Sequence, residues 1–224
     1  MFFCSLTRRI DDCASLIVKI LITNYCISMD KTHLEWKEEN RKKVFEGKIF
    51  SVWESYCKSP EVKSDKNDSP ETKPHAHVFS LIDTKDWAIV IPVIESGKGK
   101  QFLMVWQWRH GVNSMSLEFP GGVLEPGENP QEAAARELYE ETGYKPGKIK
   151  KIGEFSPNPA IMTNKVHFFL AENIESSGKQ KLDEDEYVEA TLVDAQEVIN
   201  GMGKEPYVHA LMGTALALYL KTPK

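Results

Sequence analysis

Features that would define several other protein classes are missing from this chain. No stretch of its 224 residues is both long and apolar enough to span a membrane, and no internal repeat is present. Positive charge is not in excess, because the formal net charge is -5 and the isoelectric point is near 5.8. Proteins that bind nucleic acid through phosphate contacts are usually basic. The sequence therefore predicts neither a nucleic-acid partner nor a membrane span.

Cysteine is also scarce. The four cysteines are Cys4, Cys13, Cys26 and Cys57, and three of them lie within the first 28 residues. Their spacing matches no close metal-binding pattern, and a disulfide framework would be unusual in a chain of this length. We therefore expect reduced cysteines and a cytoplasmic protein.

The first 28 residues differ in character from the rest. A basic pair is followed by an apolar run that Lys19 interrupts. Two aspartates and the lack of a small-residue cleavage site argue against a secretory signal peptide. We favour a dispensable extension, with the functional protein beginning at Met29. A signal peptide and a helix lying on a membrane surface remain alternatives.

The remainder alternates between strand-like and helix-like segments. Residues 29–49 are a polar lead-in, and residues 60–74 are rich in Ser, Asp, Lys and Pro, which is typical of an exposed loop. The predicted strands are 50–56, 77–83, 87–94, 101–108, 149–155, 165–171 and 186–193, and helices are predicted at 130–142, 194–201 and 207–219. Residues 116–119 lead into a tight turn at residues 120–122. This mixed order predicts an α/β fold in which helices pack on a sheet.

One helix carries unusually complete start and stop signals. Asn129 is a good N-cap, and Pro130 suits the first helical position because its missing N–H costs nothing there. Gly143 is placed to end the helix in a left-handed turn. We therefore predict a helix over residues 130–142.

Three carboxylates share one face of this helix. Glu137, Glu140 and Glu141 are related as i, i+3 and i+4. They repel one another unless cations bind among them, and Mg²⁺ accepts carboxylate and phosphate oxygens together. The pattern predicts a site for Mg²⁺, with Mn²⁺ as a substitute. An ordinary solvated acidic helix is the alternative.

The spacing of residues around the helix decides between a metal site and a solvated acidic helix. Gly122, Glu128 and the run from Arg136 to Gly143 stand in GVLEPGENPQEAAARELYEETGY, and together they resemble the Nudix box. Each matched position is expected by chance at roughly 5–10%, so an accidental match is improbable. The resemblance implies that Glu128 and Arg136 hold the loop and the helix together, and that Glu137, Glu140 and Glu141 bind metal.

The flanking residues resemble one branch of this superfamily. Gln107-Trp108-Arg109 and Leu117-Glu118-Phe119-Pro120-Gly121-Gly122 are similar to segments of ADP-ribose pyrophosphatases and nucleoside diphosphate sugar hydrolases. The resemblance implies that Arg109 and Glu118 contact the substrate and that the Gly121 carbonyl binds metal. Pro159 is a further marker of the substrate site, although Ala160 stands where many members have glycine.

An acidic stretch near the C-terminus supplies one more candidate. In similar enzymes a glutamate of a mobile loop positions or deprotonates the attacking water, and Glu184 and Glu186 are the best-matched residues. A solvated acidic loop is the alternative, and the sequence does not choose between the two glutamates. We interpret His110, His167 and His209 as structural.

The resemblance implies a Nudix fold, an α/β/α sandwich of mixed sheet and helices, preceded by a small β region. We divide the chain into an extension (1–28), an N-terminal β region for homodimerisation (29–86) and a hydrolase domain (87–224). The implied function is Mg²⁺-dependent hydrolysis of ADP-ribose or a nucleoside diphosphate sugar to a nucleoside monophosphate and a sugar phosphate. Alternatives are a pyrophosphatase for nucleoside triphosphates or dinucleoside polyphosphates, and a non-catalytic sensor of ADP-ribose or a nucleotide sugar.

Overall fold

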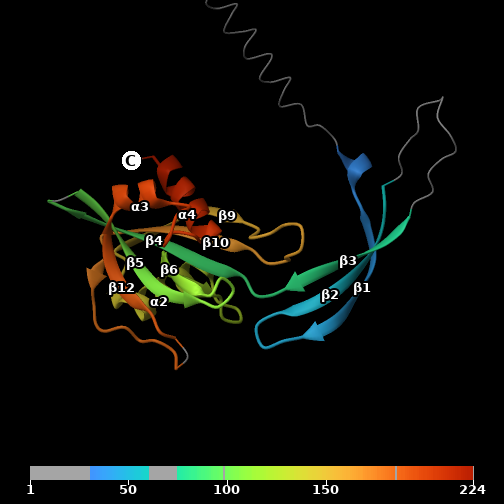
Figure 1. The fold of residues 1–224 in the computed structure, drawn as a ribbon, viewed down its shortest axis with the longest axis horizontal. Helices are drawn as coiled ribbons and strands as arrows, with labels where there is room; N and C mark the ends of the chain where they lie inside the picture. Colours follow the sequence, from blue (N-terminus) through green and yellow to red (C-terminus); the bar gives the residue numbers. More distant parts are fainter. Residues whose placement is uncertain (1–30, 61–74, 98, 185, 224) are drawn as a thin grey trace, which may run out of the picture. The chain divides into compact units, whose positions relative to one another are not determined.

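A computed structural model describes residues 31–60, 75–97, 99–184 and 186–223 (Figure 1). The predicted extension 1–28 and nearly all of the predicted loop 60–74 lie outside these ranges. By their contacts the residues form two compact units, one extending to Lys42 and including Ser55–Phe79, the other comprising Lys43–Glu54 and Ser80–Lys224. No helix among the described residues is long and apolar enough to cross a membrane.

The N-terminal strands form a three-stranded sheet in the order β1-β2-β3. After a short 3₁₀ helix, η1 (Thr32–Leu34), come β1 (Lys37–Glu46), β2 (Ser51–Lys58) and β3 (Ala76–Asp83). Strands β2 and β3 were predicted, whereas β1 lies in the predicted polar lead-in. Every residue of β1 is exposed and most are charged, so the strand depends on pairing with β2 and has no apolar alternation that the sequence could reveal.

A mixed seven-stranded sheet forms the centre of the larger unit. Its main path runs β12-β5-β4-β10-β9, with β6 paired to β5 and β7 paired to β4. Strands β4 and β10 run parallel and the other described pairs are antiparallel. The strands are β4 (Trp87–Ser96), β5 (Gly99–Arg109), β6 (Ser114–Glu118), β7 (Gly121–Val123), β9 (Lys148–Phe155), β10 (Val166–Glu172) and β12 (Glu189–Asp194), and a separate pair is formed by β8 (Tyr144–Lys145) and β11 (Glu175–Ser176).

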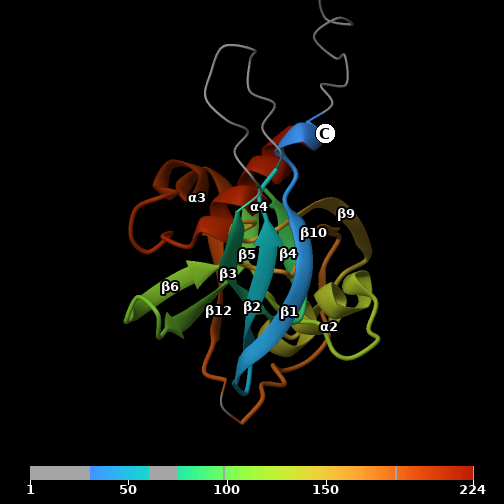
Figure 2. The same ribbon diagram turned by 90° about the vertical axis from the view of Figure 1, so that its right-hand side faces the viewer.

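Helices cover both faces of this sheet, as Figures 1 and 2 show. Helix α2 (Pro130–Thr142) packs on one face, and α3 (Ala195–Gly201) and α4 (Ala210–Lys221) pack on the other. Because side chains of a strand alternate between faces, Ala88 and Val90 of β4 pack with α2, while Ile89 and Ile91 pack with α4. The predicted α/β/α sandwich is confirmed.

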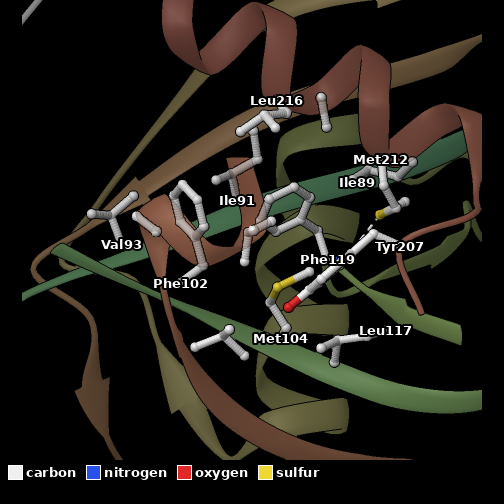
Figure 3. Packing of buried hydrophobic residues seen from close by; sticks show 14 of the residues in the cluster. Ile89, Ile91, Val93, Phe102, Met104, Leu117, Phe119, Tyr207, Met212 and Leu216 are labelled. Carbon is white, nitrogen blue, oxygen red and sulfur yellow. Dashed lines mark hydrogen bonds between the residues drawn. The ribbon is translucent and has the colours of Figure 1, made fainter. Parts of the chain in front are cut away.

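The larger hydrophobic cluster fastens α4 to the sheet (Figure 3). The Phe102 and Phe119 rings meet edge to face with centroids 5.3 Å apart, and Met212 and Leu216 of α4 are buried beside them. Full burial of each such side chain contributes roughly 1.5–3 kcal/mol. The end of β6 and the start of α4 are therefore held in fixed positions.

The predicted helices are confirmed, with small shifts at their starts. Helix α2 has the predicted bounds, whereas α4 begins at Ala210 because His209 caps it. The contact boundary between the units falls after Phe79, earlier than the expected division at residue 86. The end of β3 already bonds within the larger unit, since Ile82 and the segment around Ile161 exchange backbone hydrogen bonds.

Candidate active site

The caps of α2 form as their residue types require. Asn129 accepts a hydrogen bond from the Gln131 N–H at 2.8 Å, Pro130 occupies the first turn, and Gly143 has φ 75°. The Gly143 N–H donates to the Tyr139 carbonyl at 2.7 Å. A residue with a side chain rarely adopts this left-handed conformation, so Gly143 fixes where the helix ends.

Two carboxylates of α2 are buried against the turn that precedes the box. Gly121 donates its backbone N–H to Glu141 Oε2 at 3.0 Å. A Cβ at Gly122 would lie 2.5 Å from Glu137 Oε1, and one at Gly121 would lie 2.3 Å from the Ala88 carbonyl oxygen. Position 121 therefore requires glycine, because a side chain there would meet the backbone of β4. A side chain at position 122 would instead displace the Glu137 carboxylate.

Burial changes the protonation of these two groups. It raises the pKa of Glu137 to about 7, against the opposing charge of Arg136. Burial, followed by the charge of Glu137, raises the pKa of Glu141 well above its ordinary value. A buried carboxylate without a dedicated cation is costly. A bound cation would remove that cost.

Arg136 ties the box together. Its guanidinium donates from Nε to Glu128 Oε1 at 2.8 Å and from Nη2 to Glu128 Oε2 at 3.0 Å. Nη1 reaches Glu137 Oε1 and Glu140 Oε2, each at 2.9 Å. The hydrogen bonds to Glu128 raise the pKa of Arg136 and lower that of Glu128. Arg136 therefore connects Glu128 of the loop with Glu137 and Glu140 of α2.

The donor set fits a hydrated hard cation. No three His, Cys, Asp or Glu side chains gather tightly enough to hold an ion by themselves in the described ranges, and Glu140 faces Arg136. Mg²⁺ does not need such a cage, because it usually keeps several waters and takes one or two carboxylates plus phosphate oxygens. Glu137 and Glu141 beside the Gly121 backbone supply oxygen donors of that kind.

The two loop glutamates differ in their surroundings. Glu184 is exposed, whereas Glu186 is half-buried. The charge of Glu186 contributes to the raised pKa of both Glu137 and Glu141. Of the two loop candidates, Glu186 is therefore the one whose charge is found to affect both carboxylates.

A cavity of about 310 Å³ lies beside the glycine turn. On its wall Arg109 Nε donates to Glu118 Oε1 at 2.7 Å and Nη2 donates to Oε2 at 2.6 Å. Burial would raise the pKa of Glu118, but these hydrogen bonds and the Arg109 charge hold it below its ordinary value. The lining is completed by Ile49, Phe50, Thr84, Trp87, Ala88, Ile89, Phe119, Gly121, Gly122, Val123, His209, Leu211 and Met212.

Two further residues, Pro159 and His209, differ in whether they line this cavity. Pro159 is exposed in a turn in which the Met162 N–H donates to the Asn158 carbonyl, and it is not among the described residues lining the cavity. His209, interpreted from sequence as structural, does line the cavity. No local pattern marks His209, because the residue reaches the site only when α4 packs on the sheet.

Comparisons with known proteins identify the family. The NUDIX domain family model matches residues 84–211. The chain is 34% identical over 170 residues to the ADP-ribose pyrophosphatase of Bacillus subtilis (strain 168), covering 74% of this chain and 84% of that protein. It is 28% identical over 144 residues to the GDP-mannose pyrophosphatase of Yersinia enterocolitica, covering 56% of this chain and 73% of that protein.

A solved structure agrees in fold. The crystal structure of an ADP compounds hydrolase superposes with a TM-score of 0.68 at 19% sequence identity, covering 84% of this chain and 93% of that one. The fold and the box define a Nudix enzyme. The chain belongs to the NUDIX domain family, and its similarity to the Bacillus pyrophosphatase sets it in the ADP-ribose pyrophosphatase branch.

Proposed function

We propose that this protein hydrolyses the diphosphate linkage of ADP-ribose or a nucleoside diphosphate sugar, releasing a nucleoside monophosphate and a sugar phosphate. The observation that carries the proposal is the adjacency of two features. The buried carboxylates Glu137 and Glu141 and the cavity share the Gly121-Gly122 turn. A diphosphate at the carboxylates would place its attached group in the cavity.

The divalent cation in this proposal is Mg²⁺, with Mn²⁺ as a substitute. Glu137, Glu141, Glu140 and the Gly121 carbonyl would hold it, and Arg136 would release Glu140 for that purpose. The ion would neutralise charge that develops on the diphosphate oxygens. Arg109 supplies a further cation at the cavity wall, suited to an oxygen of the substrate.

Glu186 is the better candidate for handling the attacking water. A general base must come within hydrogen-bond reach of that water. The charge of Glu186 is among the main causes of the raised pKa of Glu137 and Glu141, whereas Glu184 is exposed and is not among those causes. We assign the role to Glu186.

A substrate panel tests the function. The purified protein is incubated with Mg²⁺ and ADP-ribose, ADP-glucose, GDP-mannose, UDP-glucose, dinucleoside polyphosphates and nucleoside triphosphates, and products are resolved by chromatography. We expect monophosphate from ADP-ribose or one nucleotide sugar, with little turnover of triphosphates. Preferred cleavage of triphosphates or dinucleoside polyphosphates would overturn the substrate class. Binding without turnover, with Mn²⁺ also tried, would indicate a sensor.

We also propose that the N-terminal β region supports a homodimer. In the smaller unit the Trp36 and Phe79 rings meet edge to face with centroids 5.1 Å apart, yet they remain 45% and 42% exposed. Aromatic rings exposed together are typical of interaction surfaces. Sedimentation should show a dimer that Trp36→Ser weakens, while the exposed control Lys42→Ser leaves it intact. A monomeric wild-type protein would contradict the proposal.

Cytoplasmic location remains a prediction from the cysteines.

A further inference from the structure

His209 lies on the wall of the cavity, and contacts with the sheet hold its backbone in place. His209 precedes α4 and is joined to the sheet on both sides, because the Leu117 N–H donates to the Pro206 carbonyl at 3.2 Å and the Phe119 N–H donates to Met212 Sδ at 3.0 Å. The Met212 side chain is buried. The His209 backbone is therefore held against the end of β6 before any ligand binds.

The tautomer of this histidine is determined as well. His209 Nδ1 accepts the Leu211 N–H at 3.1 Å as the N-cap of α4. A nitrogen that accepts cannot carry the proton, so the neutral ring bears it on Nε2. Burial lowers the pKa of His209, with the Glu118 charge opposing, which agrees with a neutral ring.

The Nε2–H is left without a hydrogen-bond partner in the described part of the chain. Its nearest recorded polar neighbour is Glu118 Oε2 at 3.9 Å, which is too long for a hydrogen bond. Glu118 itself is fully buried and engaged twice by Arg109. The His209 side chain is 29% exposed and the Arg109 side chain 39%, and both residues line the cavity together with the buried Glu118.

The charges indicate which kind of acceptor His209 would meet. Arg109 and Glu118 neutralise each other, and a neutral imidazole adds a donor without adding charge. A neutral donor in a largely apolar wall, beside Phe119 and Met212, suits an uncharged acceptor better than a phosphate, which takes cationic donors. Hydroxyl, ring-oxygen and ring-nitrogen atoms of a sugar or a nucleobase are acceptors of this class.

We propose that His209 is a specificity-determining residue that donates from Nε2 to an uncharged acceptor on the group attached to the substrate diphosphate. Glu118 is a positioning residue for Arg109 and for the His209 ring. This inference rests on the proposed function, because it takes the cavity to hold that group.

Two substitutions separate the two nitrogens of the ring. In His209→Asn, the side-chain oxygen can replace Nδ1 as the cap, but the donor is lost. In His209→Gln, the longer amide can reach the position of Nε2 and restore a donor, while the cap is weakened. His110→Asn is the matched control, because His110 is exposed and is not among the described cavity residues.

We expect His209→Asn to lower kcat/KM about 3- to 10-fold through KM, with kcat nearly unchanged and the melting temperature preserved, as for one lost hydrogen bond made in ground and transition states alike. His209→Gln should recover part of KM at a lower melting temperature. His110→Asn should behave as wild type. Unchanged KM in His209→Asn, or a loss confined to kcat, would overturn the proposal.

Pairs of substrates that differ in a single group show which group carries the acceptor for His209. ADP-ribose and ADP-glucose differ in the sugar, and ADP-glucose and UDP-glucose differ in the base. A loss in His209→Asn that depends on the sugar or on the base supports the proposal and names the source. An equal loss on all three points to a part that the three share, a phosphate or the nucleoside ribose, and overturns the assignment to the base or the variable sugar.

Failure of the proposed function is distinguishable. If the wild-type protein hydrolyses none of these compounds, calorimetric titration with ADP-ribose still measures the contact. Binding weakened about 3- to 10-fold by His209→Asn would then support the contact in a non-catalytic protein. Absent or unchanged binding would overturn it.

Discussion

Two buried acidic positions lie on either side of the Gly121-Gly122 turn, and their charges are balanced in opposite ways. Glu118 is fully buried beside Arg109, and its pKa is held below the ordinary value. Glu141 is almost as buried, but its strongest partner is a backbone N–H, and its pKa is raised well above the ordinary value. The same residue type therefore stays ionised at one position and resists ionisation at the other.

The two positions differ in whether the chain itself supplies a cation for the buried carboxylate. Arg109 completes the Glu118 position within the chain, so this pair can shape a substrate pocket without help. Glu137 contacts Arg136, which Glu128 already engages through two hydrogen bonds. Glu141 is affected by the charge of Arg109, which Glu118 already engages. A bound divalent cation, which the proposed function requires, would balance this pair of glutamates.

Removing the charge of Glu141 should have the largest effect. Glu141→Gln keeps an oxygen for the Gly121 N–H but loses a metal ligand, so we expect kcat to fall by a factor on the order of 10²–10³. The melting temperature without metal should be unchanged or higher, because a buried charge is gone. Steady-state kinetics and calorimetry check both; near-wild-type turnover would reject the metal assignment.

The loop glutamates give the next largest contrast. Glu186→Gln should lower kcat by about 10²-fold, the lower end of the range for loss of a general base. Glu184→Gln is the matched control and should change kcat less than about 2-fold. Equal losses in the two variants, measured at saturating Mg²⁺, would contradict the assignment to Glu186.

Deleting the built-in cation should make Glu118 resemble Glu141. Arg109→Met leaves a buried carboxylate unpaired, which we expect to cost about 2–3 kcal/mol of unfolding free energy, less than for a fully buried pair because Arg109 is partly exposed. Adding Glu118→Leu should recover most of that stability but not the activity. Urea denaturation measures the change in the free energy of unfolding. An unchanged value in Arg109→Met would show that the Arg109–Glu118 pair does not contribute to stability in this way.

The smallest expected effect concerns pH without metal. Because the pKa of Glu137 is raised to about 7, its stabilising protonation is fully present below the ordinary value of 4.5 and is lost as pH rises through 7. In EDTA the melting temperature should fall by about a few °C between pH 5 and pH 8 relative to Glu137→Gln. That reference cancels His209, whose lowered pKa acts in the opposite direction. Saturating Mg²⁺ should abolish the difference.

Elements with local sequence signals were predictable, whereas elements that depend on pairing with distant segments were not. The caps of α2 lie within two residues of its ends, so its bounds 130–142 were predictable. Strand β1 was not predictable, because charged exposed residues carry no periodic pattern. Pro159 was singled out by resemblance, yet the structure leaves it exposed in a turn.

The sequence by itself determined the family, the bounds of α2 and its acidic face, because each depends on residues close along the chain. Only the tertiary structure decided that Arg109 is bound to Glu118, that the charge of Glu186 raises the pKa of Glu137 and Glu141, and that His209 lines the cavity. The Arg109–Glu118 contact joins the neighbouring strands β5 and β6. His209, far from both in sequence, reaches the cavity because the apolar side chains of α4 are buried against the sheet.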